Sequence, residues 1–227
     1  MNLNNENLTN YVNSLGTDLF GFAATKDFTG APKGTHPNDI LEDAKSVLVF
    51  AKKFLASTIK ANSTIPYTII RNKLSVVIDH ISLDIAYFLE NQGYIALPTG
   101  SIGPSNYDTQ SQRSRGLISL KHAAELAGLG RIGKNTLLLN ERYGNMIWVG
   151  AVITNAEFIP GKKIEKNYCI EGCTLCIDNC PVNALDSTPV MNQLKCWNYG
   201  FSKENGSDFK IKCHTCRSIC PLCEGIC

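Results

Sequence analysis

The sequence predicts an α+β fold in two parts, a larger domain over residues 1–160 and a small cysteine-rich module over residues 161–227. Strand-like and helix-like segments follow one another irregularly in the first part, which is typical of α+β layers and not of repeating βαβ units. All ten cysteines lie from Cys169 to Cys227, so the composition changes near residue 160. A chain of 227 residues has room for one domain and a small appendage.

Hydrophobic periodicity predicts the elements of the first part. The opening residues form a short helix that stops at Gly16, and residues 67–91 form the longest helix, with one broad apolar stripe. Residues 117–126 favour a helix, and the glycines of 127–140 lead into a second short helix. Runs rich in β-branched and aromatic residues predict four strands, and polar runs rich in Gly and Pro predict two loops. The strands are 20–24, 44–50, 93–98 and 146–155, and the loops are 28–38 and 99–115.

Charge and composition limit the partners. The formal charge is +2, with 44% hydrophobic and 19% charged residues, which is typical of a globular protein and argues against a dedicated nucleic-acid surface. The chain has no apolar run long enough for a membrane span and no signal-peptide pattern at its start, so we expect a cytoplasmic protein without membrane contact. In the reducing cytosol clustered cysteines are metal ligands more often than disulfides.

The cysteines form two runs, each ending in Cys-Pro. The spacings C-x3-C-x2-C-x3-C-P and C-x2-C-x3-C-P differ by one residue from the bacterial ferredoxin pattern, in which the fourth cysteine reaches the other cluster. This crossover rule predicts two 4Fe-4S clusters. One is held by Cys169, Cys173, Cys176 and Cys220, and the other by Cys180, Cys196, Cys213 and Cys216.

Two other interpretations of the cysteines are less favoured. Structural zinc also uses C-x2-C pairs, but it seldom needs eight ligands with prolines at these positions. A disulfide framework is disfavoured because a secretion signal is absent. Cys223 and Cys227 stay unassigned, and Cys223 is an alternative ligand to Cys220.

Gly128, Gly130 and Gly133 form a G-x-G-x-x-G pattern. The glycines follow a predicted helix instead of a strand, so NAD binding is disfavoured. Two interpretations are open: the glycines allow a large flat ligand close to the backbone, with the amides of Lys134 to Thr136 at a helix start, or they serve helix packing alone.

The segments 41–54, 126–144 and 149–155, together with the double cysteine motif, resemble the epoxyqueuosine reductase family and, more distantly, the corrinoid reductive dehalogenases. The resemblance implies a nitroreductase-like domain that holds cobalamin and a ferredoxin-like module that delivers electrons to its cobalt. Carried over by position, it implies that the corrinoid contacts are Gly128, Leu129, Gly130, Ile132, Gly133, Lys134, Asn135 and Thr136.

The chain departs from the family pattern at the proton donor. Ser114 stands where the family has an acidic residue, and Leu117 stands where it has a proline. The catalytic residue is therefore unassigned, and Asp108 and Tyr107 of the long polar loop are candidates for supplying a proton.

These features predict a redox protein in which two 4Fe-4S clusters pass electrons to a bound cobalamin, for reduction of a small-molecule substrate or of the corrinoid itself. Its electron donor would be a ferredoxin or flavodoxin. One alternative is a non-catalytic electron carrier without corrinoid, which the missing acid favours. Another is a tRNA-modifying reductase that reaches its substrate through a partner subunit.

Overall fold

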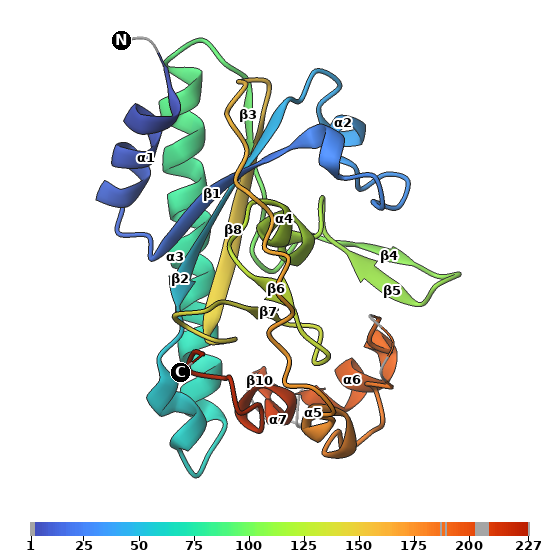
Figure 1. The fold of residues 1–227 in the computed structure, drawn as a ribbon. Coiled ribbons are helices and arrows are strands. Elements are labelled where there is room, and N and C mark those ends of the chain that lie inside the picture. Colours follow the sequence, from blue (N-terminus) through green and yellow to red (C-terminus); the bar gives the residue numbers. More distant parts are fainter. Residues whose placement is uncertain (1–2, 187, 189, 203–208, 227) are drawn as a thin grey trace.

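The structure is a computed structural model that describes residues 3–186, 188, 190–202 and 209–226. A four-stranded antiparallel sheet with strand order β1-β2-β8-β3 forms its centre (Figure 1). The strands are β1 (Leu19–Ala24), β2 (Ser46–Lys53), β8 (Ile147–Thr154) and β3 (Ala96–Pro98). The mixed α/β architecture predicted from the sequence is confirmed.

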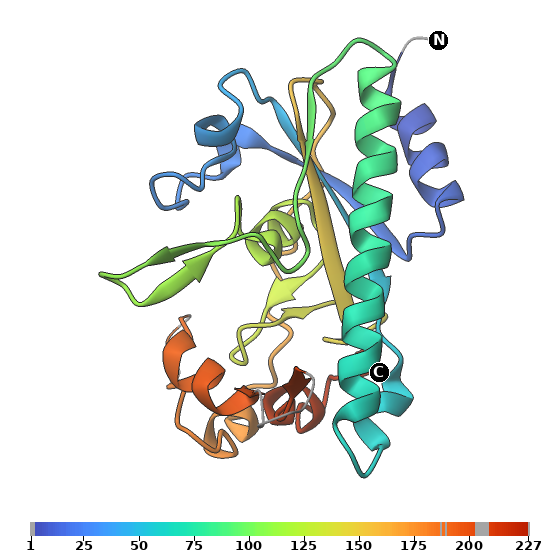
Figure 2. The same cartoon turned by 180° about the vertical axis from the view of Figure 1, so that it is seen from behind.

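Both faces of the sheet are buried, each by its own apolar core. Alternate side chains of a strand point to opposite faces, so one strand contributes to both cores. Val47 and Val49 of β2 belong to one apolar core with α4 (Leu120–Leu126), and Leu48 and Phe50 belong to the other. Helices α3 (Ile65–Glu90) and α1 (Asn5–Ser14) cover that second face (Figure 2). The domain therefore has three layers, with the sheet in the middle.

Two segments differ from the prediction. Residues 127–140 contain a small hairpin of β6 (Arg131–Ile132) and β7 (Leu138–Leu139) where a short helix was predicted. Its turn is closed by backbone hydrogen bonds from Thr136 to Gly133 and from Gly133 to Leu137, at 2.8 and 2.9 Å, and Thr136 has φ 60°. A left-handed residue interrupts a helix, which explains the error.

The predicted loop 99–115 contains a second hairpin, β4 (Asn106–Asp108) with β5 (Arg113–Arg115), which projects from the body of the molecule (Figure 1). Its strands carry mostly polar residues, so they lack the apolar alternation by which strands are predicted.

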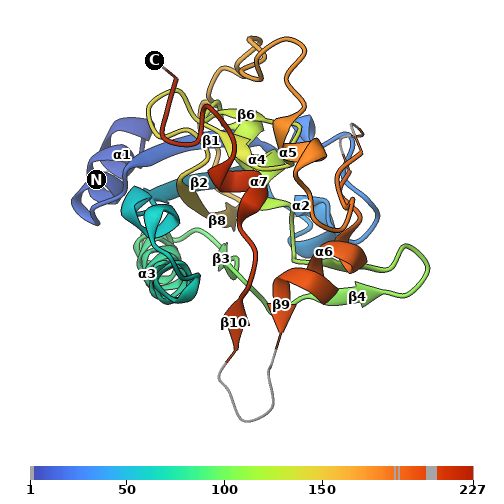
Figure 3. The ribbon, with the colours of Figure 1, turned by 90° about the horizontal axis from the view of Figure 1, so that it is seen from below.

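The cysteine-rich module packs against the lower end of the first domain, where Figure 3 shows α5, α6 and α7 gathered. The Ile211 amide donates to the Thr68 hydroxyl of α3 at 3.1 Å. None of the described helices is long and apolar enough to cross a membrane. The remaining elements are η1 (Thr25–Asp27), α2 (Pro37–Ile40), η2 (Ala56–Lys60), α5 (Leu175–Asp178), α6 (Gln193–Gly200), β9 (Phe201–Ser202), β10 (Lys210–Ile211) and α7 (Thr215–Ser218).

Candidate functional site

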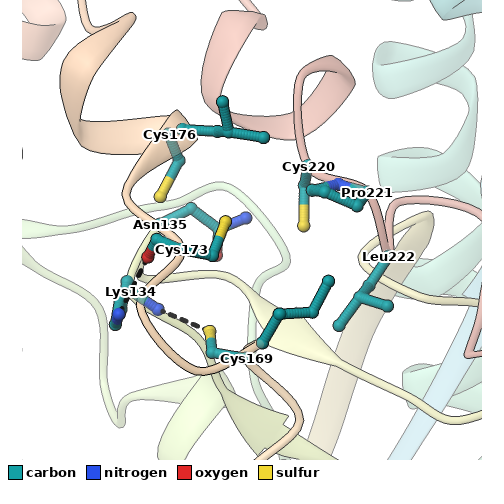
Figure 4. Close-up of a pocket in the computed structure, with 10 residues that line it drawn as sticks. Lys134, Asn135, Cys169, Cys173, Cys176, Cys220, Pro221 and Leu222 are labelled. Carbon is teal, nitrogen blue, oxygen red and sulfur yellow. Dashed lines mark hydrogen bonds between the residues drawn. The ribbon is translucent and has the colours of Figure 1, made fainter.

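Four thiols line one pocket at the junction of the two parts. They come from Cys169, Cys173, Cys176 and Cys220, and Figure 4 shows their sulfur atoms facing the same space. Cys169 and Cys173 precede α5, Cys176 lies within α5, and Cys220 follows α7. Apolar side chains and two residues of the β6–β7 turn complete the wall of the pocket: Ile170, Leu175, Pro221, Leu222, Lys134 and Asn135.

The β6–β7 turn of the first domain forms hydrogen bonds to the cysteines of the module. The Lys134 amide donates to Cys169 Sγ at 3.4 Å, and Lys134 Nζ donates to the Cys173 carbonyl at 2.8 Å. Asn135, which is buried, donates from Nδ2 to the Cys216 carbonyl at 3.2 Å. These three hydrogen bonds fix the β6–β7 turn against the cysteine-rich module.

Cys180, Cys196, Cys213 and Cys216 form a second group of thiols. Burial raises the pKa of Cys196, and its neighbours Cys213 and Cys180 raise it further. Burial also raises the pKa of Cys216 to about 12, with Cys196 and Cys213 acting in the same direction and the charge of Arg217 acting against them. The Ala184 amide donates to Cys180 Sγ at 3.2 Å.

The structure therefore places Cys169, Cys173 and Cys176 of the first run around one pocket with Cys220 of the second run. The binding of clusters by this set and by the second set stays a prediction. Four thiols around a shared space are the donor set of a 4Fe-4S cluster, so the residues fit that group. Within the described residues, no three His, Cys, Asp or Glu side chains are placed to hold a single metal ion.

Two cysteines are unassigned, Cys223 and Cys227. Cys223 is adjacent to the first set, since its amide donates to the Cys220 carbonyl at 3.0 Å, and burial raises its pKa. It is not part of the pocket lining. Cys227 lies outside the described residues.

A larger cavity of about 630 Å³ opens beside the thiol pocket. Residues 27–35, the end of β5, α4 and residues 190–193 of the module line it, together with Lys163. Thr136 also lines this cavity, whereas its neighbours Lys134 and Asn135 line the thiol pocket. The β6–β7 turn is thus the partition between the two spaces.

Two basic side chains of α4 face the cavity. Burial lowers the pKa of Lys121, and Arg113 lowers it further, while Lys121 Nζ donates to the Thr136 carbonyl. Burial, followed by the charge of Lys121, lowers the pKa of His122, whose Nδ1 is 2.7 Å from the Ser119 hydroxyl. His122 is therefore neutral at pH 7. In the sequence, nothing beyond its position ahead of the glycine run distinguishes His122.

The glycines of the G-x-G-x-x-G pattern lie against this chain's own backbone. A Cβ atom on Gly128 would be 2.5 Å from the Lys162 carbonyl oxygen, and one on Gly130 would be 2.3 Å from that of Leu139. Packing within the protein thus explains both glycines. Among the eight residues expected to contact a corrinoid, Thr136 lines the large cavity, Lys134 and Asn135 line the thiol pocket, and the contact with a corrinoid stays a prediction.

The two proton-donor candidates lie on the projecting β4–β5 hairpin. Neither Asp108 nor Tyr107 lines the large cavity, and Tyr107 is exposed. The Ser111 hydroxyl, which donates to the Asp108 carboxylate, is the main cause that lowers the pKa of Asp108. A carboxylate that stays ionised is a poor proton donor. Both residues are therefore unsuited to protonate a ligand in the cavity.

Ser114, at the position of the family's acid, does line the cavity. Its amide donates to Gln193 Oε1 at 2.7 Å, and its carbonyl accepts from Gln193 Nε2 at 3.3 Å. Arg113 Nη2 donates to the Met191 carbonyl at 3.2 Å. These bonds join β5 to the start of α6, so the module forms part of the cavity wall.

The chain is similar to curated epoxyqueuosine reductases, although no family model matches it. It is 35% identical to the enzyme of Bacillus cereus over 129 residues, which are 52% of this chain and 33% of that protein. It is 33% identical to the enzyme of Lactococcus garvieae over 134 residues, which are 55% of this chain and 37% of that protein. The matched region therefore spans about a third of the length of these relatives.

Solved structures share the fold. Epoxyqueuosine reductase of Streptococcus thermophilus superposes with a TM-score of 0.64 at 21% identity, over 100% of this chain and 67% of that chain. A catabolic reductive dehalogenase superposes with a TM-score of 0.68 at 18% identity, over 96% of this chain and 31% of that chain. The resemblance to epoxyqueuosine reductases and, more distantly, to reductive dehalogenases is confirmed.

Proposed function

We propose that this chain is a redox protein that passes electrons through two 4Fe-4S clusters to a corrinoid held in the large cavity. The observation that carries the proposal is the β6–β7 turn, because Lys134 and Asn135 line the thiol pocket and the next residue, Thr136, lines the cavity. A single turn of the backbone separates the two spaces. An electron carrier in one and an acceptor in the other would therefore lie close together.

In this proposal the first cluster is bound by Cys169, Cys173, Cys176 and Cys220, and the second by Cys180, Cys196, Cys213 and Cys216. Burial raises the pKa of Cys176, Cys196, Cys216 and Cys220, so these thiols need a bound metal to become thiolates at neutral pH. The module would then be ferredoxin-like and the first domain nitroreductase-like.

Cobalamin is the proposed occupant of the cavity, because one structural neighbour is a reductive dehalogenase whose structure suggests a mechanism for B12-dependent dehalogenation. When bound, it would supply a cobalt centre that accepts electrons and passes them to a substrate. The cavity is large, flanked by both parts of the chain, and lined by polar as well as apolar side chains. Lys121 and Arg113 would orient polar groups of the ligand or substrate in the cavity.

His122 is the proposed proton-handling residue in place of Asp108 and Tyr107. Its ring faces the cavity, and the Ser119 hydroxyl holds the orientation of that ring through Nδ1. A neutral imidazole with one nitrogen held in this way can transfer a proton through the other. The substrate would be a small molecule or the corrinoid itself, and the electron donor a ferredoxin or flavodoxin in the cytoplasm.

Anaerobic purification tests both parts of the proposal. We expect iron and sulfide for two clusters, and a shift of the corrinoid absorption bands that survives desalting after incubation with cobalamin. Gly116→Trp fills the cavity that Gly116 lines, whereas Leu117→Trp places the same side chain at an exposed position outside the lining. Corrinoid retention should fall only in Gly116→Trp, with cluster content unchanged in both variants.

Two outcomes would favour other functions. Protein with both clusters but without any corrinoid shift or retention would be a non-catalytic electron carrier, which the replacement of the family's acid by Ser114 favours. A third function is reduction of a modified tRNA. It is favoured by one structural neighbour, an epoxyqueuosine reductase with an epoxyqueuosine-modified tRNA stem loop, at a TM-score of 0.59 and 22% identity. A salt-sensitive gel shift with tRNA would support it.

A further inference from the structure

Arg217 is a buried cation within the cysteine-rich module. It lies on α7, next to Cys216, and is 5% exposed. Its guanidinium donates from Nη1 to the Asn145 carbonyl and from Nε to the Tyr67 hydroxyl at 3.1 Å. The guanidinium carbon lies 5.6 and 6.0 Å from the ring centroids of Phe54 and Tyr67. Two rings and two fixed acceptors thus hold this group in one place.

All of these partners are electrically neutral. In the part of the chain that the structure describes, no carboxylate forms an ion pair with Arg217. Arginine keeps its proton in proteins, and a buried charge without a counter-charge is strongly destabilising. A negative group close to the guanidinium would therefore offset the free-energy cost of burying its charge.

The thiol sets are the negative groups that metal binding would create beside it. Arg217 directly follows Cys216 of the second set on α7, and its carbonyl accepts from the amide of Cys220, a member of the first set, at 3.4 Å. A 4Fe-4S cluster with four thiolate ligands has a net negative charge, which grows by one when the cluster takes up an electron.

We propose that Arg217 is an internal counter-charge for the clusters of the module, and that it raises the reduction potential of the nearer cluster. The inference rests on the proposed function, because it requires the clusters. A fixed positive charge stabilises the reduced cluster more than the oxidised one, since the reduced cluster has the larger negative charge. Arg217 thus acts through its charge on the reduction potential of the cluster, and it makes no contact with the substrate.

The test is a redox titration of the clusters, poised with dithionite and followed by electron paramagnetic resonance, in the intact anaerobic protein. Arg217→Gln removes the charge and keeps a hydrogen-bond donor. We expect one midpoint potential to fall by about 59 mV, which is about tenfold in the reduction equilibrium of a one-electron couple. Arg217→Lys keeps the charge, so its potentials should stay close to those of the wild type even where its stability falls.

Two controls separate charge from structure. Lys45→Gln removes an exposed charge just before the first residue of β2 and should leave both potentials unchanged. Tyr67→Phe removes the neutral partner of Nε and should lower stability without a change of potential. If Arg217→Gln does not accumulate, Arg217→Met serves, because replacing a buried charge by an apolar side chain of similar size often preserves folding.

The inference fails if an uncharged variant contains both clusters and has wild-type potentials, since Arg217 then only docks α7 against the first domain. It also fails if Arg217→Lys shifts a potential as far as Arg217→Gln. These results differ from a failure of the proposed function, in which the wild-type protein itself contains no iron and no sulfide.

Discussion

Asn135 connects the β6–β7 turn to the cysteine-rich module, and replacing it by alanine tests that connection. Its Nδ2 donates to the Cys216 carbonyl at 3.2 Å, and its Oδ1 accepts from the Leu137 amide at 3.1 Å. Asn135→Ala leaves two backbone groups without partners, one of them next to the second thiol set. A buried polar group without a partner costs about 1–3 kcal/mol, and water can reach part of this turn, so we expect a loss of about 2–4 kcal/mol.

This loss corresponds to a fall in Tm of about 5–15 °C for a domain of this size. Circular dichroism during heating measures it, and the bleaching rate of the cluster absorption under a chelator should rise as well. Asn5→Ala is the matched control, because the half-buried Asn5 of α1 also bridges two backbone groups, those of Ile159, but through hydrogen bonds that are exposed to solvent. A Tm and a bleaching rate equal to those of the wild type in Asn135→Ala would refute the structural role of this bridge.

Three further predictions follow from the site and the core. Cys220→Ala should lose about four of about eight iron atoms while Cys223→Ala keeps them all, and iron analysis showing the reverse would assign Cys223 as the ligand. The pKa of His122 is lowered in the folded state, so its contribution to stability is present above the unfolded pKa near 6.5 and is lost as the pH falls through the folded pKa. Urea unfolding of His122→Gln should accordingly show a smaller loss between pH 7.5 and 5.5 than the wild type, and an equal loss would contradict the prediction. Gly150→Ala places a Cβ atom 2.5 Å from Ile78 Cγ2, so it should lower the free energy of unfolding by about 1–3 kcal/mol, and an unchanged urea midpoint would show that α3 moves freely.

The longest elements were predicted from the sequence because their signal is local. The run from Val47 to Phe50 is buried on both faces, and such a strand reads as a continuous apolar segment. Helix α3 has an apolar stripe over many turns, which tolerates errors at single positions. The two hairpins were missed because β6 and β7 are two-residue strands, and the strands of the β4–β5 hairpin are short and mostly polar.

The meeting of Cys220 with the thiols of the first run around one pocket was also predicted from the sequence, through the likeness of the spacings to the ferredoxin pattern. The residues that line the cavity could not be predicted from the sequence. Lys121 and His122 on α4 meet Arg113 on β5 only after the module has packed against the hairpin, through bonds such as those of Ser114 with Gln193. The sequence likewise did not show that Asp108 and Tyr107 lie outside the lining of the cavity, because position in a polar loop does not say which way a hairpin projects.

By itself, the sequence determined the main strands and the long helix of the sheet domain and the two closely spaced cysteine runs, because local periodicity and short spacing are properties of neighbouring residues. Only the tertiary structure decided that Lys134 and Thr136 border different spaces, and that Arg217 is enclosed by Phe54 and Tyr67. Those relations depend on contacts between residues far apart in the chain, and no local pattern encodes them.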